Sequence, residues 1–227
     1  MTGINHSIGI ENESSLHHSL KVYYAQPGKT ETTMEGYVCD AIGSAGEVIE
    51  IQTGNFGALK KKIPILAKSG KVRIIYPVIV KKTLELYDIK GKLLNRRKSP
   101  KKGVVWDIFN ELVYAPELLK LKGLTIEIIY VDAIERRRKD GKGSWRRKGI
   151  SIEDKILENR REGIALKQKA DWKRHFLPIK KQCSSKTLAI AAQISTETAR
   201  KAIYTMEKAG FLKKLHKEGR FWIYKIK

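Results

Sequence analysis

The stretch DAIGSAGEVIEIQ, residues 40–52, predicts two short β-strands joined by a tight turn. In its second strand polar and apolar residues alternate, so a period of two places Glu50 and Gln52 on one face and the isoleucines on the other. A three-residue loop at 44–46 would set Asp40 directly opposite Glu50, with their Cβ atoms about 5 Å apart. Two like charges at that separation destabilise a hairpin unless something compensates them, and a divalent cation is the simplest compensation.

Two alternatives to a metal site stay open for this hairpin. A register shifted by one residue would move the Asp40 side chain to the other face of the sheet. A solvent-exposed hairpin would leave the two acids apart, which is the commoner situation for an Asp and a Glu that flank a turn. The sequence on either side of the hairpin bears on this choice.

The composition predicts a folded globular protein of the cytoplasm. The chain has 227 residues, 41% of them hydrophobic, which is enough for one large domain or two modest ones. No run approaches the roughly 18 apolar residues of a membrane span, and the start MTGINHSIGIENES lacks the basic and apolar regions of a signal peptide, so we expect neither membrane insertion nor secretion. Cys39 and Cys183 lack metal-binding spacing, as do the five histidines, so we expect reduced thiols.

The net charge of +22 is distributed unevenly along the chain. Residues 1–132 contain 19 Lys+Arg against 14 Asp+Glu, residues 133–150 contain 8 against 2, and residues 151–227 contain 19 against 8. A positive field of this kind attracts polyanions, and without a membrane signal the expected polyanion is nucleic acid. Charge alone leaves anionic membrane surfaces and ribosomal RNA open.

The character of the sequence changes near residue 133, which predicts two domains. Before it, short β-rich runs alternate with helical ones, as in an α/β domain built on a mixed sheet. The segment ERRRKDGKGSWRRKG that follows is polar, contains glycine and is mostly basic, which is typical of a linker or a mobile arm. We therefore predict a domain at 1–134, a basic linker at 135–150 and a second domain at 151–227.

The first domain is predicted to begin with a helix that carries an acid toward the core. On a helical wheel of ENESSLHHSLKVYYA, Glu13 lies within the apolar arc around Leu16, whereas Glu11 lies on the opposite side. Further elements are expected as helices at 55–67, with a break or kink at Pro64, and near 106–113, as strands at 31–42, 47–53, 72–80 and 124–134, and as a hairpin around 85–94.

This order of a helix with an acid, an Asp at a strand end, a Glu-X-Gln strand and a Lys-rich helix resembles the PD-(D/E)XK nuclease superfamily. The resemblance implies that Asp40 and Glu50 bind Mg²⁺, or Mn²⁺ in its place, together with the backbone carbonyl of Ile51. It also implies that Gln52 holds the position of the motif lysine and that Glu13 is the accessory acid of the first helix. The implied fold is a mixed sheet flanked by helices, and the implied activity is metal-dependent phosphodiester hydrolysis.

Two residues depart from the superfamily motif. Cys39 stands where a proline commonly precedes the aspartate, and Gln52 replaces the lysine that positions the attacking water. Some restriction enzymes of the superfamily are similar in using Glu-X-Gln, so the change is compatible with catalysis. Lys60 or Lys62 on the following helix could supply the missing charge. The resemblance covers roughly residues 10–80.

The C-terminal part contains two helical segments, a tight turn and an alternating hairpin pattern. In SSKTLAIAAQISTETARKAIYTMEKAGFLKKL, Ser195 or Thr196 can cap the second helix and Gly210 can end it. These features resemble a winged helix-turn-helix DNA-binding domain, which implies a recognition helix at 196–209 and a wing at 213–225. A small helical accessory domain with a solvated charged face is the alternative.

Basic and aromatic side chains away from the carboxylates are expected to contact the DNA. The run RRKSPKKG, residues 96–103, could grip phosphates or form an ordinary solvated loop. Trp145, within a basic run, could stack on a base or pack on a neighbouring side chain. The predicted contact residues are Lys60, Lys62, Arg96, Arg97, Thr198, Arg200, Lys201, Tyr204, Lys208, Lys217 and Arg220.

Together these features predict a cytoplasmic, Mg²⁺-dependent DNA endonuclease that a winged-helix domain places on double-stranded DNA. The lysines and arginines would hold the DNA backbone while Asp40 and Glu50 hold the metal. Restriction, repair and mobile-element roles all fit this layout. The alternative from another class is a non-catalytic DNA-binding regulator in which the nuclease-like fold is a scaffold, and a monomer and a homodimer are both open.

Overall fold

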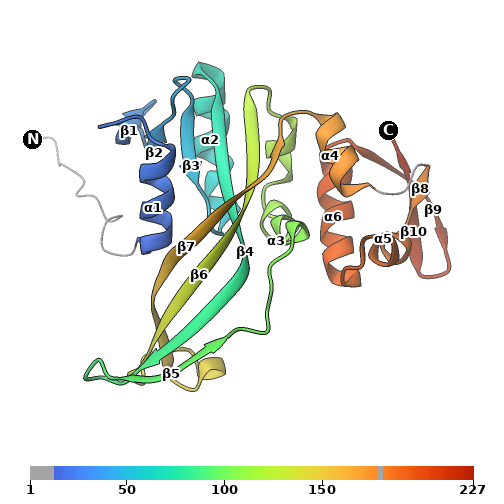
Figure 1. The fold of residues 1–227 in the computed structure, drawn as a ribbon. Coiled ribbons are helices and arrows are strands. Elements are labelled where there is room, and N and C mark those ends of the chain that lie inside the picture. Colours follow the sequence, from blue (N-terminus) through green and yellow to red (C-terminus); the bar gives the residue numbers. More distant parts are fainter. Residues whose placement is uncertain (1–12, 178–180) are drawn as a thin grey trace, which may run out of the picture.

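A computed structural model describes residues 13–177 and 181–227, and Figure 1 shows their arrangement. They form a mixed α/β fold built on a seven-stranded sheet, with a smaller three-stranded sheet near the C-terminus. Helices flank the large sheet, so the predicted class, an α/β fold on a mixed sheet, is confirmed at this level. None of the helices in these two ranges is both long enough and apolar enough to span a membrane.

The helices and strands alternate through the first part of the chain. The helices are α1 (Ser15–Tyr24), α2 (Leu59–Ser69), α3 (Phe109–Leu112), α4 (Lys169–Phe176), α5 (Ser185–Ala192) and α6 (Thr196–Lys208), with 3-10 turns η2 (Phe56–Ala58), η3 (Val105–Ile108), η4 (Pro116–Lys120) and η5 (Trp145–Arg147). The strands are β1 (Thr30–Met34), β2 (Tyr37–Ile42), β3 (Val48–Ile51), β4 (Val72–Tyr87), β5 (Leu93–Lys98), β6 (Leu124–Lys139), β7 (Ile150–Leu166), β8 (Gln182–Cys183), β9 (Leu212–Glu218) and β10 (Phe221–Ile226).

Three parallel strands form the centre of the large sheet. The strand order is β1-β2-β3-β4-β6-β7, with β5 beside β4; β3, β4 and β6 are parallel, and the outer pairs are antiparallel. The apolar cluster on one face includes Leu16 and Leu20 of α1, and the cluster on the other includes residues of α2, α3 and α6. Because both faces are covered, central residues such as Ile74 and Ile75 are fully buried.

The β2–β3 hairpin has the predicted register. The Gly43 N–H donates to the Glu47 carbonyl at 2.8 Å, which closes a three-residue loop, and Ala41 pairs with Ile49. All four residues of β3 are buried, because α1 covers one side of this strand and α2 covers the other. The alternative of a solvent-exposed hairpin is therefore excluded, and the carboxylate of Glu50 lies inside the fold.

Helix α2 continues through Pro64, so of the predicted break or kink the break is absent. Proline lacks an N–H and removes one helical hydrogen bond, the one to the carbonyl of Lys60. Lys60 is exposed, where water can bond that carbonyl, whereas Ile63 and Leu66 keep the opposite face of the helix in the core. Burial of the apolar face therefore outweighs the local cost of the proline.

Strands β4 to β7 extend beyond the body of the sheet and form the arm at the bottom of Figure 1, residues 81–103 and 133–157. The segment predicted as a linker, 135–150, is not a linker. Its first residues complete β6 and pair with β7, and the rest is the turn between these strands. The predicted boundaries at 134 and 150 are wrong for the same reason. A solvated β-ribbon is polar and basic, and its composition resembles that of a linker.

The C-terminal segment, residues 167–227, shares its core with the large sheet. The helices and the hairpin predicted there are present. The ring centroid of Phe176 on α4 lies 4.9 Å from that of Phe109 on α3, and the Lys201 Nζ on α6 donates to Asn110 Oδ1 at 2.9 Å. One buried cluster runs from the sheet through α3 to α6, so this segment packs directly on the sheet.

Candidate functional site

Asp40 on β2 and Glu50 on β3 form the centre of the candidate site. Glu50 is 3% exposed, and Asp40 is half-buried. One carboxylate oxygen of Asp40 accepts a hydrogen bond from the Ile51 N–H at 2.7 Å, so the hairpin brings the aspartate next to the peptide that follows Glu50. The pKa of Asp40 is lowered, because the neighbouring His17, the Ile51 N–H and Lys62 outweigh the opposing effect of burial.

Lys62 of α2 provides the cation closest to Glu50. Its Nζ lies 2.6 Å from Glu50 Oε1 and donates to the Val38 carbonyl at 2.6 Å. The contact with Oε1 is an ion pair without hydrogen-bond geometry, so Oε1 is a buried oxygen with no hydrogen-bond partner. Burial, helped by the charge of Asp40 and opposed by Lys62, raises the pKa of Glu50 to about 7. Of the two lysines predicted to supply this charge, Lys62 reaches the site, and Lys60 points into solvent.

His17 of α1 links the two sides of the site and was missed in the sequence. Its Nε2 donates to the Ile51 carbonyl at 2.9 Å and lies 3.4 Å from Asp40 Oδ2, and its Nδ1 contacts Glu13 Oε1. Burial alone would lower its pKa, but the bonds and charges of Asp40 and Glu13 raise it to about 9, so the imidazole is protonated at neutral pH. The spacing Glu13, His17, Lys21, four residues apart, could have revealed this cluster, because it places all three on one helical face.

Glu13 has two hydrogen-bonded cationic partners that were not predicted from the sequence. It lies just before α1, and its carboxylate accepts hydrogen bonds from His17 and from the Nζ of Lys21, the latter at 2.8 Å. Lys21 is itself buried and also donates to Glu31 at 2.9 Å. These partners outweigh burial and lower the pKa of Glu13. Glu11, predicted to lie on the opposite side of the helix, falls outside the described residues.

Gln52 follows β3 directly and is tied to the backbone. Its N–H donates to the Ile75 carbonyl at 2.9 Å, and its side-chain amide donates to the Gly54 carbonyl. The position that the superfamily motif gives to lysine is thus held by an uncharged amide, and the ammonium group beside Glu50 comes from Lys62 on the next helix.

A divalent cation fits the oxygen atoms of this site. The Asp40 and Glu50 carboxylates and the Ile51 carbonyl are hard oxygen donors, which Mg²⁺ and Mn²⁺ prefer, and Glu50 Oε1 has capacity for a ligand. Among the described residues, no three His, Cys, Asp or Glu side chains form a metal-binding group, so solvent or substrate oxygens would have to complete the coordination. A cation on the Ile51 carbonyl would share that oxygen with the protonated His17 imidazole or displace it.

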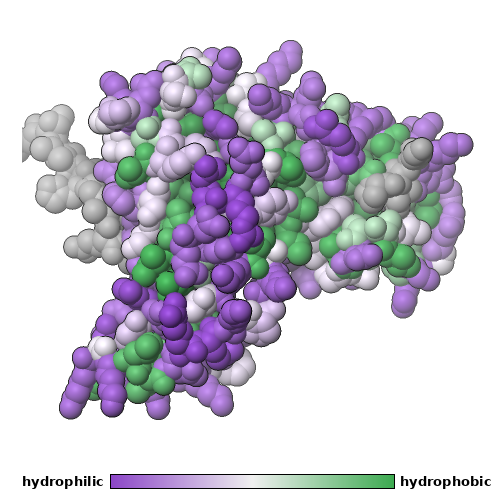
Figure 2. Space-filling model, in the orientation of Figure 1, coloured by the Kyte–Doolittle hydropathy of each residue, from purple (hydrophilic) through white to green (hydrophobic). Residues whose placement is uncertain are grey.

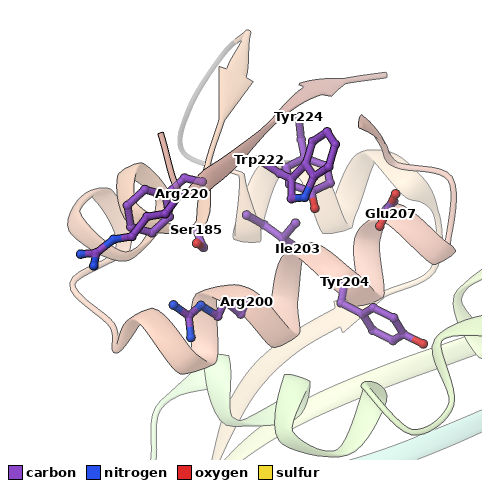
Figure 3. Close-up of a pocket in the computed structure, with 9 residues that line it drawn as sticks. Ser185, Arg200, Ile203, Tyr204, Glu207, Arg220, Trp222 and Tyr224 are labelled. Atoms are coloured by element: carbon purple, nitrogen blue, oxygen red, sulfur yellow. The ribbon is translucent and has the colours of Figure 1, made fainter. Parts of the chain in front are cut away.

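Several predicted DNA-contact residues line a hollow of about 250 Å³ between α6 and the β9–β10 hairpin (Figure 3). Arg200 and Tyr204 line it from α6, and Arg220 and Trp222 line it from the hairpin. The Nζ of Lys214 lies 3.9 Å from the centroid of the Trp222 ring. Trp222 was not among the predicted contacts, although its place in the alternating hairpin pattern, beside basic residues, could have indicated it.

Other predicted DNA contacts are engaged within the fold. Lys62 is paired with Glu50, Lys201 is bonded to Asn110, and the N–H of Thr198 donates to the Ser195 side chain that caps α6. Lys62 and Lys201 therefore do not project freely toward a ligand, because their ammonium groups bind partners inside the fold. The predicted contact residues that lie exposed outside the hollow are Lys60, Arg96, Arg97, Lys208 and Lys217.

Comparison with known proteins places the site within a family domain. A family model described as a domain of unknown function (DUF8091) matches residues 14–167. A protein of Treponema pallidum (strain Nichols), described as an uncharacterized protein, is 32% identical over 148 residues, and the match covers 64% of this chain but only 59% of the length of that relative. No solved structure matches the chain. The family match covers α1, the large sheet and the arm, and it ends just after β7.

Proposed function

We propose that this chain, which belongs to the DUF8091 family, is a metal-dependent endonuclease that hydrolyses phosphodiester bonds in double-stranded DNA. The observation that carries the proposal is the group formed by Asp40, Glu50 and Lys62 around the Ile51 peptide. Two carboxylates, a backbone carbonyl and a lysine are the groups that the PD-(D/E)XK resemblance requires. Here the lysine comes from α2, which compensates for Gln52.

The residues have separate roles in the proposed reaction. Asp40, Glu50 and the Ile51 carbonyl would hold Mg²⁺ or Mn²⁺, which when bound lowers the pKa of a water molecule and neutralises charge on the phosphate. Lys62 opposes the rise in the pKa of Glu50, and so keeps more of this carboxylate ionised for metal binding. Its ammonium group also orients the Glu50 side chain and provides a positive charge beside an anionic substrate.

The C-terminal segment supports DNA as the substrate. Its elements α4, β8, α5, α6, β9 and β10 follow the order helix, strand, helix, helix, hairpin, which is that of a winged helix-turn-helix domain. Residues 167–227 contain 16 Lys+Arg against 4 Asp+Glu. Arg200 and Tyr204 on α6 and Arg220 on the hairpin face solvent around one hollow. In this proposal α6 and the hairpin contact DNA and position it for cleavage.

A second candidate function is a DNA-binding regulator without catalytic activity. The observation in its favour is that each carboxylate of the site already has a cationic side chain beside it. Lys62 lies against Glu50, His17 against Asp40 and Lys21 against Glu13. A site whose charges are neutralised internally can be stable without a metal.

A plasmid-nicking assay separates the two functions. With Mg²⁺ or Mn²⁺, the wild-type protein should convert supercoiled plasmid to open-circle or linear DNA, and Asp40→Asn should abolish this activity because it removes a metal ligand. Glu47→Gln is the matched control, because Glu47 lies on the same hairpin but pairs with Arg73 outside the site. No cleavage of any DNA by the wild-type protein would favour the regulator.

Metal binding can be measured without cleavage. A cation that binds only the folded protein raises its unfolding free energy by about 2.7 kcal/mol at 100 times the dissociation constant. We therefore expect Mg²⁺ or Mn²⁺ to raise the melting temperature of the wild-type protein and of Glu47→Gln, and to leave that of Asp40→Asn unchanged. Equal shifts in all three proteins would argue against metal binding at Asp40.

A further inference from the structure

The arm carries as much net charge as the whole C-terminal segment. Its residues, 81–103 and 133–157, contain 18 Lys+Arg against 6 Asp+Glu, a net charge of +12. Residues 167–227 carry +12 as well, so the rest of the chain, which includes the candidate site, has a net charge of −2. The positive charge of the protein is therefore concentrated in two separate regions, and the proposed function uses only one of them.

Two buried carboxylates hold the base of the arm together. Glu135 is 3% exposed and accepts a hydrogen bond from the Lys82 Nζ at 2.9 Å and another from Arg137. Glu85 on the neighbouring strand lies 3.3 Å from Arg96. These acids neutralise their immediate partners, and most of the other basic side chains of the arm are exposed. In Figure 2 the surface of the arm is mostly hydrophilic. Exposed basic residues of the arm include Arg97, Lys98, Lys101, Lys102, Arg146 and Lys148.

The tip of the arm presents an exposed tryptophan on a well-defined turn. The Gly143 N–H donates to the Gly149 carbonyl at 3.0 Å, and Asp140 accepts hydrogen bonds from the Lys142 N–H and the Ser151 hydroxyl. A Cβ at Gly143 would lie 1.8 Å from the Ile150 carbonyl oxygen, so the two sides of the turn approach closely.

Trp145 on this turn is 84% exposed, so it does not pack on a neighbouring side chain. A large apolar ring in water, between exposed basic residues, is the arrangement that a protein uses to stack on a nucleobase while phosphates are neutralised beside it. Bases within an intact duplex are covered by their neighbours, and they offer a face only where stacking is interrupted.

We propose that the arm is a second DNA-binding element, separate from α6 and the β9–β10 hairpin, and that Trp145 stacks on a base exposed at an interruption of the duplex. This proposal rests on the proposed function for the choice of DNA as the polyanion. It narrows the substrate to duplex DNA that contains an unpaired or displaced base. The basic strands of the arm bind the phosphates on either side of that base.

The proposal is tested by equilibrium binding with the full-length protein in EDTA, where no cleavage takes place. The probes are a fully paired duplex and the same duplex with a short unpaired bulge, and binding is followed by fluorescence anisotropy. Trp145→Ala should weaken binding to the bulged duplex by roughly 5- to 150-fold, the equivalent of one stacked base, and binding to the paired duplex by less than about twofold. Tyr114→Ala, which removes another exposed ring outside the arm, should leave both affinities unchanged.

A second variant tests the phosphate contacts. Arg146→Gln combined with Lys148→Gln should reduce the slope of log affinity against log salt by about 1.8, because each lost phosphate contact contributes about 0.9. An unchanged slope, or equal affinities of Trp145→Ala and wild type for the bulged duplex, would overturn the proposal. A Trp145 effect seen only with single-stranded RNA would overturn the choice of DNA. Because these measurements need no metal, an absence of nicking activity would refute the nuclease and leave the arm proposal standing.

Discussion

The candidate site and the arm use charge in opposite ways. In the site, the carboxylates of Asp40, Glu50 and Glu13 are buried or half-buried, and each lies beside a cationic side chain from another turn or another element. In the arm, most basic groups face water, and a single tryptophan projects among them. The pKa values of the site depend on contacts that the fold creates. The positive electrostatic potential around the arm depends instead on how many basic residues it contains. Substitutions should therefore have large, specific effects in the site and small, additive ones on the basic surfaces.

The largest effect is expected for Lys62. Lys62→Met keeps most of the side-chain volume but leaves Glu50 buried without its cation, so the pKa of Glu50 should rise and the affinity for metal should fall. We expect cleavage to decrease by roughly 10²- to 10⁴-fold, the range for one positioned catalytic group. Lys61→Met, at an exposed position of the same helix that is not among the predicted DNA contacts, should change the rate by less than about twofold. Equal losses in both variants, measured as initial nicking rates, would mean that only the general charge of α2 matters.

The hairpin was predictable from the sequence because its register follows from local rules. Loop length and alternation place Asp40 opposite Glu50, and no other part of the chain is needed for that inference. The partners were harder to predict, because His17 and Lys62 reach the site from helices on opposite faces of the sheet. From the sequence, either Lys60 or Lys62 could be the lysine beside Glu50, and only the packing of α2 distinguishes the two. Periodicity places an acid on a helix face and does not show which cation will neutralise it.

A smaller effect is expected for His17, and it should depend on pH. The folded-state pKa of about 9 lies above the ordinary value of 6.5, so its stabilising contribution is complete below pH 6.5 and is lost as the pH rises through 9. The shift corresponds to about 3 kcal/mol of unfolding free energy. The difference in unfolding free energy between wild type and His17→Gln, measured by urea denaturation in EDTA, should therefore shrink by this order between pH 6.5 and 9.5. His216→Gln, at an exposed position, provides the control, and a difference that does not vary with pH would contradict the assignment of a protonated His17.

The arm shows where composition misleads. Residues 135–150 were predicted as a linker because they are basic, polar and rich in glycine, and the structure uses the same features for a solvated ribbon and its turn. The signal for a strand was present but weak, since the inward residues there include a buried carboxylate, Glu135, in place of an apolar residue. An ion pair that replaces a hydrophobic contact removes the alternation on which strand prediction depends. The partner Lys82, which bonds to Glu135, lies on β4, far away in the sequence, so the local pattern does not reveal it.

The smallest effects are expected on α6, where two neighbouring basic residues differ in their surroundings. Arg200 is exposed beside the hollow, whereas the Nζ of Lys201 is bonded to Asn110 and lies 2.9 Å from Glu197. Arg200→Gln should weaken duplex binding by several-fold and reduce the salt dependence by about 0.9, because it removes one phosphate contact. Lys201→Gln should leave the salt dependence unchanged and instead lower stability slightly, since exposed ion pairs contribute about 0.2–1 kcal/mol. Point substitutions are the suitable test because α6 also covers α3, so a truncation would uncover the shared core. If Lys201→Gln reduced the salt dependence as much as Arg200→Gln, Lys201 would have to contact phosphate in the complex. Helix α6 would then have to leave α3 when DNA binds, and the contact between the two helices would exist only in the free protein.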